Sequence, residues 1–143
     1  MLSKVTIDIA TAEEVIAAAT SHAQAMGIPQ NIAIVDEAGH LVAFRRMDGA
    51  KFFSIEIAIT KAFAAAGTRK PTKDTGPATQ PGNPGYGAQA LLGGRFTTLP
   101  GGIPLLVDGV VVGAIGVSSG TTAEDQQVAE HAVTYFNERW GRS

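Results

Sequence analysis

The chain has 143 residues, no cysteine and a formal net charge of −2 at pH 7, with eleven basic and thirteen acidic residues. The absence of cysteine excludes disulfides, thiolate nucleophiles and cysteine-ligated zinc. No run of Lys or Arg forms a basic stripe, so the charge pattern does not fit a protein that binds nucleic acid through its phosphates. The length predicts a single domain over residues 1–143, large enough to fold without a metal or disulfide.

The N-terminus, MLSKVTIDIATAEE, lacks an apolar region after a basic start. No signal peptide is therefore visible, and a cytoplasmic location is predicted. No stretch reaches the ~18 uncharged apolar residues of a membrane helix, so membrane insertion is not expected. Only 17% of the residues are charged. This is below the usual share, and the extra apolar surface favours a homo-oligomer.

The first helix is predicted over residues 11–26. Thr11 and Glu14 fit a capping box at its start, and Gly27 fits its C-terminal stop. Apolar side chains recur at three- and four-residue steps and share one face with His22. Small alanines flank this histidine, which leaves room for a ligand beside its imidazole.

A β-hairpin is predicted next, with strands over 31–35 and 40–47 joined by turn residues at 36–39. Residues 41–44 are apolar on both faces, so this part of the strand is expected to be covered on both sides. A second helix is predicted over 51–66. It is apolar nearly all round, which predicts that another subunit covers its second side.

The segment 68–94 is crowded with Gly and Pro and carries few charges. Long loops in compact domains are usually functional or disordered. The tightly patterned flanks favour an ordered functional loop here, with one or two helical turns over residues 86–92.

The C-terminal part predicts three more strands and a last helix. The strands are 95–99, 102–107 and 110–117. Asp108-Gly109 is a strong hairpin turn, and Gly113 and Gly116 mark a close approach of another backbone or a ligand. A capping box at Thr121 begins the helix. The predicted fold class is α+β, with a mostly antiparallel five-stranded sheet flanked by helices.

Common catalytic and metal-binding motifs are missing, including nucleotide-binding loops and zinc spacings, so the candidates are single side chains. His22 comes first, because a neutral imidazole nitrogen is a good ligand for heme iron or a metal. The alternative is a packed histidine with one satisfied hydrogen bond. His40 is expected to be exposed, and His131 to lie on the flank of the final helix's apolar stripe.

Arg46 offers a fork of donors to a carboxylate or a propionate. The alternative is an Arg–Asp pair with Asp48 that fixes the strand–helix corner. Lys61 lies among apolar neighbours, and burial there would lower its pKa and suit it to act as a base. The favoured alternative is that its methylene chain lies along apolar surface while its ammonium group is solvated or paired. The Gly/Pro loop adds Thr72 and Tyr86 as candidates.

Four segments, in order, resemble the GlcG/HbpS family, which also occurs as the C-terminal domain of PduO-type cobalamin adenosyltransferases. They are NIAIVDEAGHLVAFRRMDGA from Asn31, IAITKAFAAAG from Ile57, PTKDTGPATQPGNPGYG from Pro71 and GGIPLLVDGVVVGAIGVSSGTTAEDQQVAEHAV from Gly101. The resemblance covers residues 5–138. It implies a profilin-like fold, a homo-oligomer such as an octamer, and heme binding in several members.

The resemblance also implies roles for two residues. In the PduO-type domains a histidine of the first helix holds heme, and His22 occupies a similar place. In the HbpS-type members a threonine of the loop after the second helix is implicated, and Thr72 is the nearest match.

Two functions of different classes follow. The first is an oligomeric accessory or sensing protein that binds heme or a related tetrapyrrole through His22 or a loop residue, with Arg46 as a propionate partner. The second is an enzyme of a catabolic pathway that acts on a small organic acid or aldehyde. Its pocket would be formed by Lys61, Arg46, Asp48 and Tyr86. A structural subunit of a larger metabolic complex is a third alternative.

Overall fold

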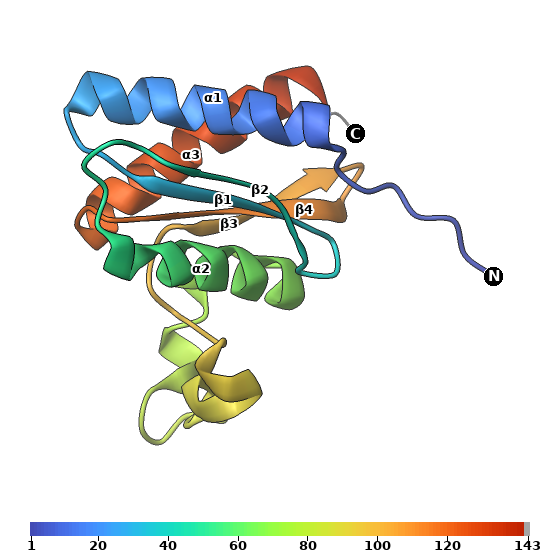
Figure 1. The fold of residues 1–143 in the computed structure, drawn as a ribbon. Helices are drawn as coiled ribbons and strands as arrows, with labels where there is room; N and C mark the ends of the chain where they lie inside the picture. The colour runs from blue at the N-terminus through green and yellow to red at the C-terminus, as the bar shows by residue number, and fades with distance from the viewer. Residues whose placement is uncertain (142–143) are drawn as a thin grey trace.

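A four-stranded antiparallel sheet with helices on both faces forms the body of the protein in the computed structural model, which describes residues 1–141 (Figure 1). The last two residues of the domain predicted over 1–143 lie outside the described residues. In chain order the elements are α1 (Ile9–Met26), β1 (Asn31–Asp36), β2 (Leu41–Arg46), α2 (Ile55–Thr68), β3 (Gly102–Val107), β4 (Val110–Ser118) and α3 (Thr122–Arg139).

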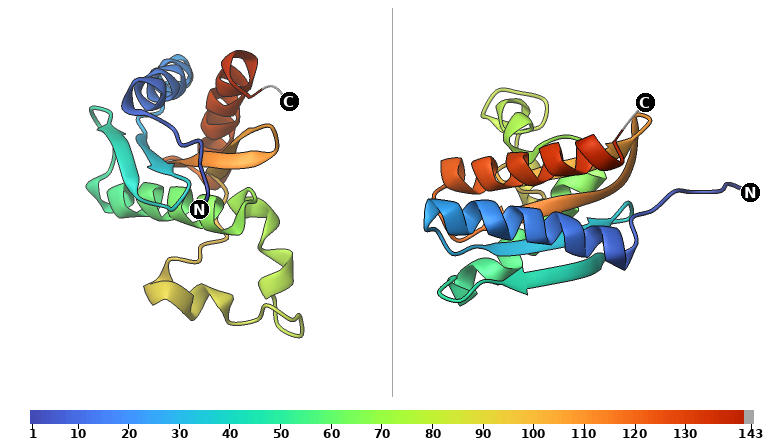
Figure 2. Two further views of the ribbon diagram at one scale, coloured as in Figure 1. Left: turned by 90° about the vertical axis from the view of Figure 1, so that its right-hand side faces the viewer. Right: turned by 90° about the horizontal axis from the view of Figure 1, so that it is seen from above.

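The strand order is β2-β1-β4-β3, and every neighbouring pair is antiparallel. Two hairpins, β1–β2 and β3–β4, therefore meet along β1 and β4 in the middle of the sheet. Helices α1 and α3 cover one face and α2 covers the other (Figure 2). The predicted α+β class and the antiparallel sheet are confirmed.

The strand predicted over 95–99 is wrong, and the sheet has four strands among the described residues. The Arg95 guanidinium lies 4.2 Å from the centre of the Phe63 ring, and its Nε donates to the carbonyl of Leu92. The carbonyl of Leu99 accepts from the hydroxyl of Thr72. These groups make loop contacts instead of a strand ladder.

The helix ends follow local capping chemistry. Helix α1 begins two residues before the predicted start, because the Asp8 carboxylate accepts from the backbone N–H of Thr11 at 2.8 Å. Gly27 ends the helix at φ 72°, as predicted. The capping box at Thr121 is confirmed, with Glu124 as its second member.

Two apolar layers hold the elements together. The larger core lies between the sheet and the α1–α3 pair, and alanines dominate the smaller one between the sheet and α2. A Cβ at Gly116 would lie 2.0 Å from the carbonyl oxygen of Ala58, and one at Gly102 would lie 2.4 Å from that of Lys61. Only glycine at these positions allows α2 to pack directly on the sheet backbone, as the close approach predicted for Gly116 requires.

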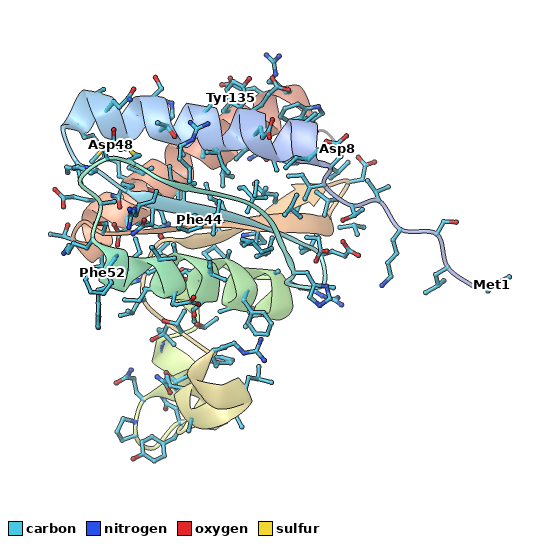
Figure 3. All side chains as sticks on the ribbon, viewed as in Figure 1. Met1, Asp8, Phe44, Asp48, Phe52 and Tyr135 are labelled. Atoms are coloured by element: carbon cyan, nitrogen blue, oxygen red, sulfur yellow. The ribbon has the colours of Figure 1, made fainter. Side chains whose placement is uncertain are left out.

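Some apolar surface stays open in the single chain. Strand β2 lies at a sheet edge with Leu41 exposed, so residues 41–44 are not covered on both faces as expected. In the 3-10 turn just before α2, Phe52 and Phe53 are 77% and 75% exposed, and Phe52 points outward (Figure 3).

Residues 72–94 form an arm that projects beyond α2 (Figure 1). It contains 3-10 turns at Thr72–Asp74, Pro77–Thr79 and Ala88–Gly94. The turns expected over 86–92 are thus found slightly later in the chain, interrupted by non-helical backbone at Leu91.

No helix within residues 1–141 combines the length and the apolar character needed to cross a membrane.

Candidate functional site

His22 of α1 and His131 of α3 stack face to face in the seam between the two helices. Their ring centres are 4.2 Å apart and their planes differ by 15°. His22 is partly buried, whereas His131 is exposed. A partly protected imidazole thus lies at an open seam that solvent or a ligand can reach.

The arrangement follows from the way α1 and α3 pair. At the other end of the seam, the Tyr135 hydroxyl donates to Glu14 at 3.1 Å, and Arg139 lies 3.5 Å from the same carboxylate. These contacts set the two helices antiparallel. One turn before His131 along α3, the Gln127 side-chain nitrogen lies 3.4 Å from Nε2 of His22.

Burial, and to a lesser degree the nearby charge of His131, lowers the pKa of His22 below its ordinary value of 6.5. This lowering of the pKa favours the neutral form of the His22 ring. The neutral ring is the form that has a lone pair to offer to a metal.

The single imidazole of His22 suits an iron whose other ligands come from a cofactor. Among residues 1–141 there is no group of three or more His, Cys, Asp or Glu side chains that could hold a metal ion. Heme carries four ring nitrogens for its iron and needs only axial ligands from the protein. A single neutral imidazole at an open seam fits that need.

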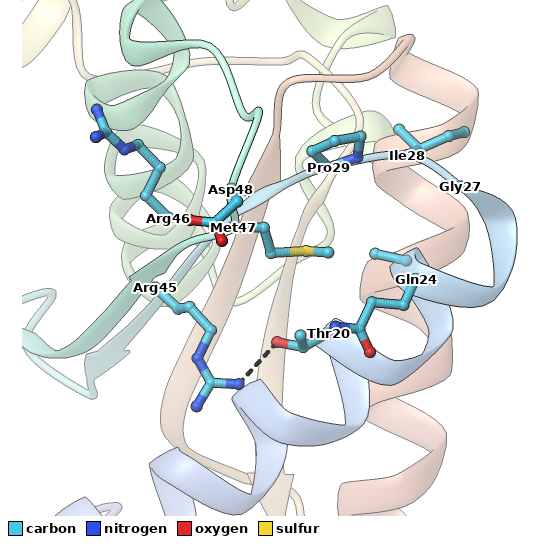
Figure 4. A pocket seen from close by; sticks show the side chains of 10 residues that line it. Thr20, Gln24, Gly27, Ile28, Pro29, Arg45, Arg46, Met47 and Asp48 are labelled. Atoms are coloured by element: carbon cyan, nitrogen blue, oxygen red, sulfur yellow. Dashed lines mark hydrogen bonds between the residues drawn. The ribbon is translucent and has the colours of Figure 1, made fainter.

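Arg46 and Asp48 lie elsewhere, at a hollow of ≈ 560 Å³ between the end of β2 and the C-terminal part of α1 (Figure 4). Arg45 also lines it, and its guanidinium donates to the hydroxyl of Thr20 at 3.1 Å. The ion pairs found within residues 1–141 do not include Arg46 or Asp48, so the alternative of an Arg–Asp corner pair is wrong. His22 does not line this hollow.

Lys61 is buried, with 1% of its side chain exposed. Its ammonium donates to the Asp125 carboxylate and to the carbonyl of Val117, both at 2.9 Å. Burial lowers the pKa of Lys61, and Asp125 opposes that effect. The paired-head interpretation is confirmed, but the head is inside the protein, so Lys61 is not placed to serve as a base for a substrate in solution.

Thr72 and Tyr86 fall on the projecting arm, across the sheet from the α1–α3 seam (Figure 1). Thr72 is fully buried, and its hydroxyl accepts from the backbone N–H of Gly102 at 3.1 Å while donating to Leu99. It anchors the arm to β3. Tyr86 is 68% exposed. The candidate residues therefore do not form one site: His22 lies in the seam, Arg46 and Asp48 at the hollow, and Tyr86 on the arm.

The contributions of His131 and Gln127 were missed at the sequence level. Their four-residue spacing on the last helix puts them on one face, which is a weak signal. Which helix this face would meet depends on packing across the sheet, and no local pattern encodes it.

Comparisons with known proteins identify the family. The chain is similar to a 15.0 kDa protein from the dhaT–dhaS intergenic region of Citrobacter freundii, with 35% identity over 93% of this chain and 94% of the relative. Its fold matches that of Klebsiella pneumoniae ORFY at a TM-score of 0.93, with 32% identity over 96% of this chain and 94% of that one.

A crystal structure of a PduOC–heme complex matches at a TM-score of 0.87, with 31% identity over 91% of this chain and 94% of that one. The chain is also 33% identical over 84% of its length to the corrinoid adenosyltransferase PduO of Salmonella typhimurium, but spans only 36% of that protein. The family model described as "Haem degrading protein HbpS-like" matches residues 7–134. The chain therefore belongs to the HbpS-like family.

Proposed function

We propose that the protein binds heme, or a related tetrapyrrole, at the α1–α3 seam, with His22 as the iron ligand. The observation that carries the proposal is the neutral, partly exposed imidazole of His22 in the seam. The similar PduOC domain was crystallised with heme, which supports the same class of ligand here. Bound heme would supply a redox-active iron, as an oligomeric accessory or sensing protein needs.

Each nearby side chain has a definite part in this proposal. His22 offers its ring nitrogen, and Gln127, 3.4 Å from Nε2, must move off that atom before iron can occupy its place. Gln127 is exposed, so it can swing into solvent. Arg46 lies at the hollow, which His22 does not line.

A hemin titration tests the proposal. Purified protein is titrated with hemin while the Soret band is followed, alongside His22→Ala and the control His40→Ala. The His40 side chain is 83% exposed in the β1–β2 turn region, away from the seam. We expect saturable binding by the wild type and His40→Ala, and a weakened, shifted spectrum in His22→Ala.

Saturable binding that His22→Ala leaves unchanged would move the ligand away from the seam and contradict the assignment. No saturable binding at stoichiometric hemin would reject heme as the ligand.

The Arg46–Asp48 hollow keeps a second candidate function open, that of an enzyme acting on a small organic acid. The hollow has room for a small molecule, and its arginines have no carboxylate partner among residues 1–141. Lys61 and Tyr86, the other residues suggested for this role, do not line it. In Figure 4 the Arg45 side chain reaches toward Thr20 and the Arg46 side chain points away from the hollow. Under this alternative, Arg45→Ala would abolish binding or turnover of a small carboxylate, and His22→Ala would leave both unchanged.

A further inference from the structure

Two histidines meet in the α1–α3 seam, and their geometry determines whether both can bind one iron. The rings of His22 and His131 are nearly parallel, with 4.2 Å between their centres and 15° between their planes. A ring nitrogen's lone pair lies in the plane of its own ring. The two rings therefore direct their nitrogens side by side instead of toward each other.

Heme leaves only two positions for protein ligands, on opposite sides of the porphyrin plane. Two histidines that fill both must point their nitrogens at one another, each about 2 Å from the iron midway between them. A face-to-face pair of rings has no space for the porphyrin between them. While the stack persists, His22 and His131 cannot both be ligands of the same iron.

The stack also restrains His22. Its ring is partly buried on α1, with the His131 ring against one face and the Gln127 amide beside Nε2. His131 is the more exposed partner. Side chains that hold a metal-binding histidine in one orientation commonly change metal affinity by 10- to 100-fold when they are removed.

We propose that His131 is a positioning residue for His22 and that each chain supplies a single histidine to the heme iron. This inference rests on the proposed function, since it concerns the orientation of the same ligand. Aromatic stacking, and not the ring nitrogens, is the property of His131 that matters. Phenylalanine, which can stack but cannot ligate, should therefore replace it.

Ferric hemin complexes of the wild type, His131→Phe and His131→Ala test the proposal, with affinity from Soret titrations and spin state from electron paramagnetic resonance. We expect the same spin state in all three proteins. Hemin affinity should fall by about 10-fold or more in His131→Ala. It should stay close to the wild-type value in His131→Phe.

A change from low to high spin in both variants would identify His131 as a ligand and overturn the proposal. Hemin binding to His131→Ala as tight as to the wild type would overturn the positioning role. Failure of the proposed function is a different result, namely hemin binding that does not depend on His22.

The stack can also be tested without heme. In the ligand-free protein, the His131 ring should shift the NMR signals of the His22 ring protons. The shift should persist in His131→Phe and vanish in His131→Ala. If the wild type lacked this shift, the rings would not be stacked in solution and the proposal would be overturned. This result does not depend on whether hemin binds.

Discussion

At the scale of single residues, the packing of His22 between α1 and α3 shifts its pKa. Helical spacing and flanking alanines placed it on the inward face of the first helix. Its low pKa arises from partial burial and from His131, which lies on the last helix. Burial and cross-helix contacts are products of tertiary packing, so the chain pattern identified the ligand candidate without its orientation or charge state.

The pKa of His22 makes the stability of the ligand-free protein depend on pH. Because this pKa is lowered on folding, the unfolded chain binds the proton more readily. The free energy of unfolding should therefore decrease as pH falls through 6.5, whereas above 6.5 this penalty is absent. His22→Phe keeps an aromatic ring in the stack and removes the titration, so it should lose this part of the pH dependence.

Urea unfolding at several values between about pH 5 and pH 8 measures the effect, since this is the range in which histidine changes charge. His40→Ala serves as the control, because His40 is exposed in the turn region. A pH dependence that is the same in the wild type and His22→Phe would contradict the lowered pKa.

At the scale of elements, local signals were reliable where a few neighbouring residues determine the structure. Asp108 and Gly109 form the predicted turn with φ values of 51° and 76°, and α3 begins with the predicted capping box. The start of α1 was wrong because Asp8 and Thr11 are both good capping residues and only the folded backbone selects one. The extra strand over 95–99 failed because strand pairing is a long-range property.

The buried Lys61–Asp125 pair links α2 to α3 and gives a prediction on stability. Lys61→Met would leave the Asp125 carboxylate buried without its cation, although it still accepts from the backbone N–H of Gly120. We expect a loss of about 3–5 kcal/mol in the free energy of unfolding. The double variant Lys61→Met/Asp125→Leu should lose less than the two single variants together.

Chemical denaturation of the four proteins provides the comparison. Arg139→Met is a matched control, because the Arg139–Glu14 pair is about half exposed and should contribute no more than about 1 kcal/mol. If Lys61→Met and Arg139→Met lowered the free energy of unfolding equally, the buried pair would contribute no more to stability than the exposed one.

At the scale of the whole molecule, the single chain leaves large apolar side chains exposed. The exposed aromatic side chains include Phe52, Phe53 and, on the projecting arm, Tyr86. The apolar pattern of the second helix predicted a subunit interface on its outer side.

If the exposed phenylalanines lie in a subunit interface, replacing them should change the assembly. We expect the wild type to be a homo-oligomer, and Phe52→Ser/Phe53→Ser to shift it toward smaller species, because burial of two large aromatic side chains is lost. Sedimentation velocity measures the distribution, and Leu2→Ser is a control for an exposed apolar residue in the N-terminal segment. A monomeric wild type, or an unchanged distribution, would contradict this expectation.

A crystal structure of the protein grown with stoichiometric hemin would show whether His22 holds heme iron in the α1–α3 seam. We expect iron about 2 Å from a ring nitrogen of His22, the usual metal–imidazole distance. Gln127 should be displaced from that atom, and His131 of the same chain should still be stacked on the ring. Iron bound at the projecting arm or at the Arg46 hollow, with the seam unchanged, would show that His22 is not the iron ligand.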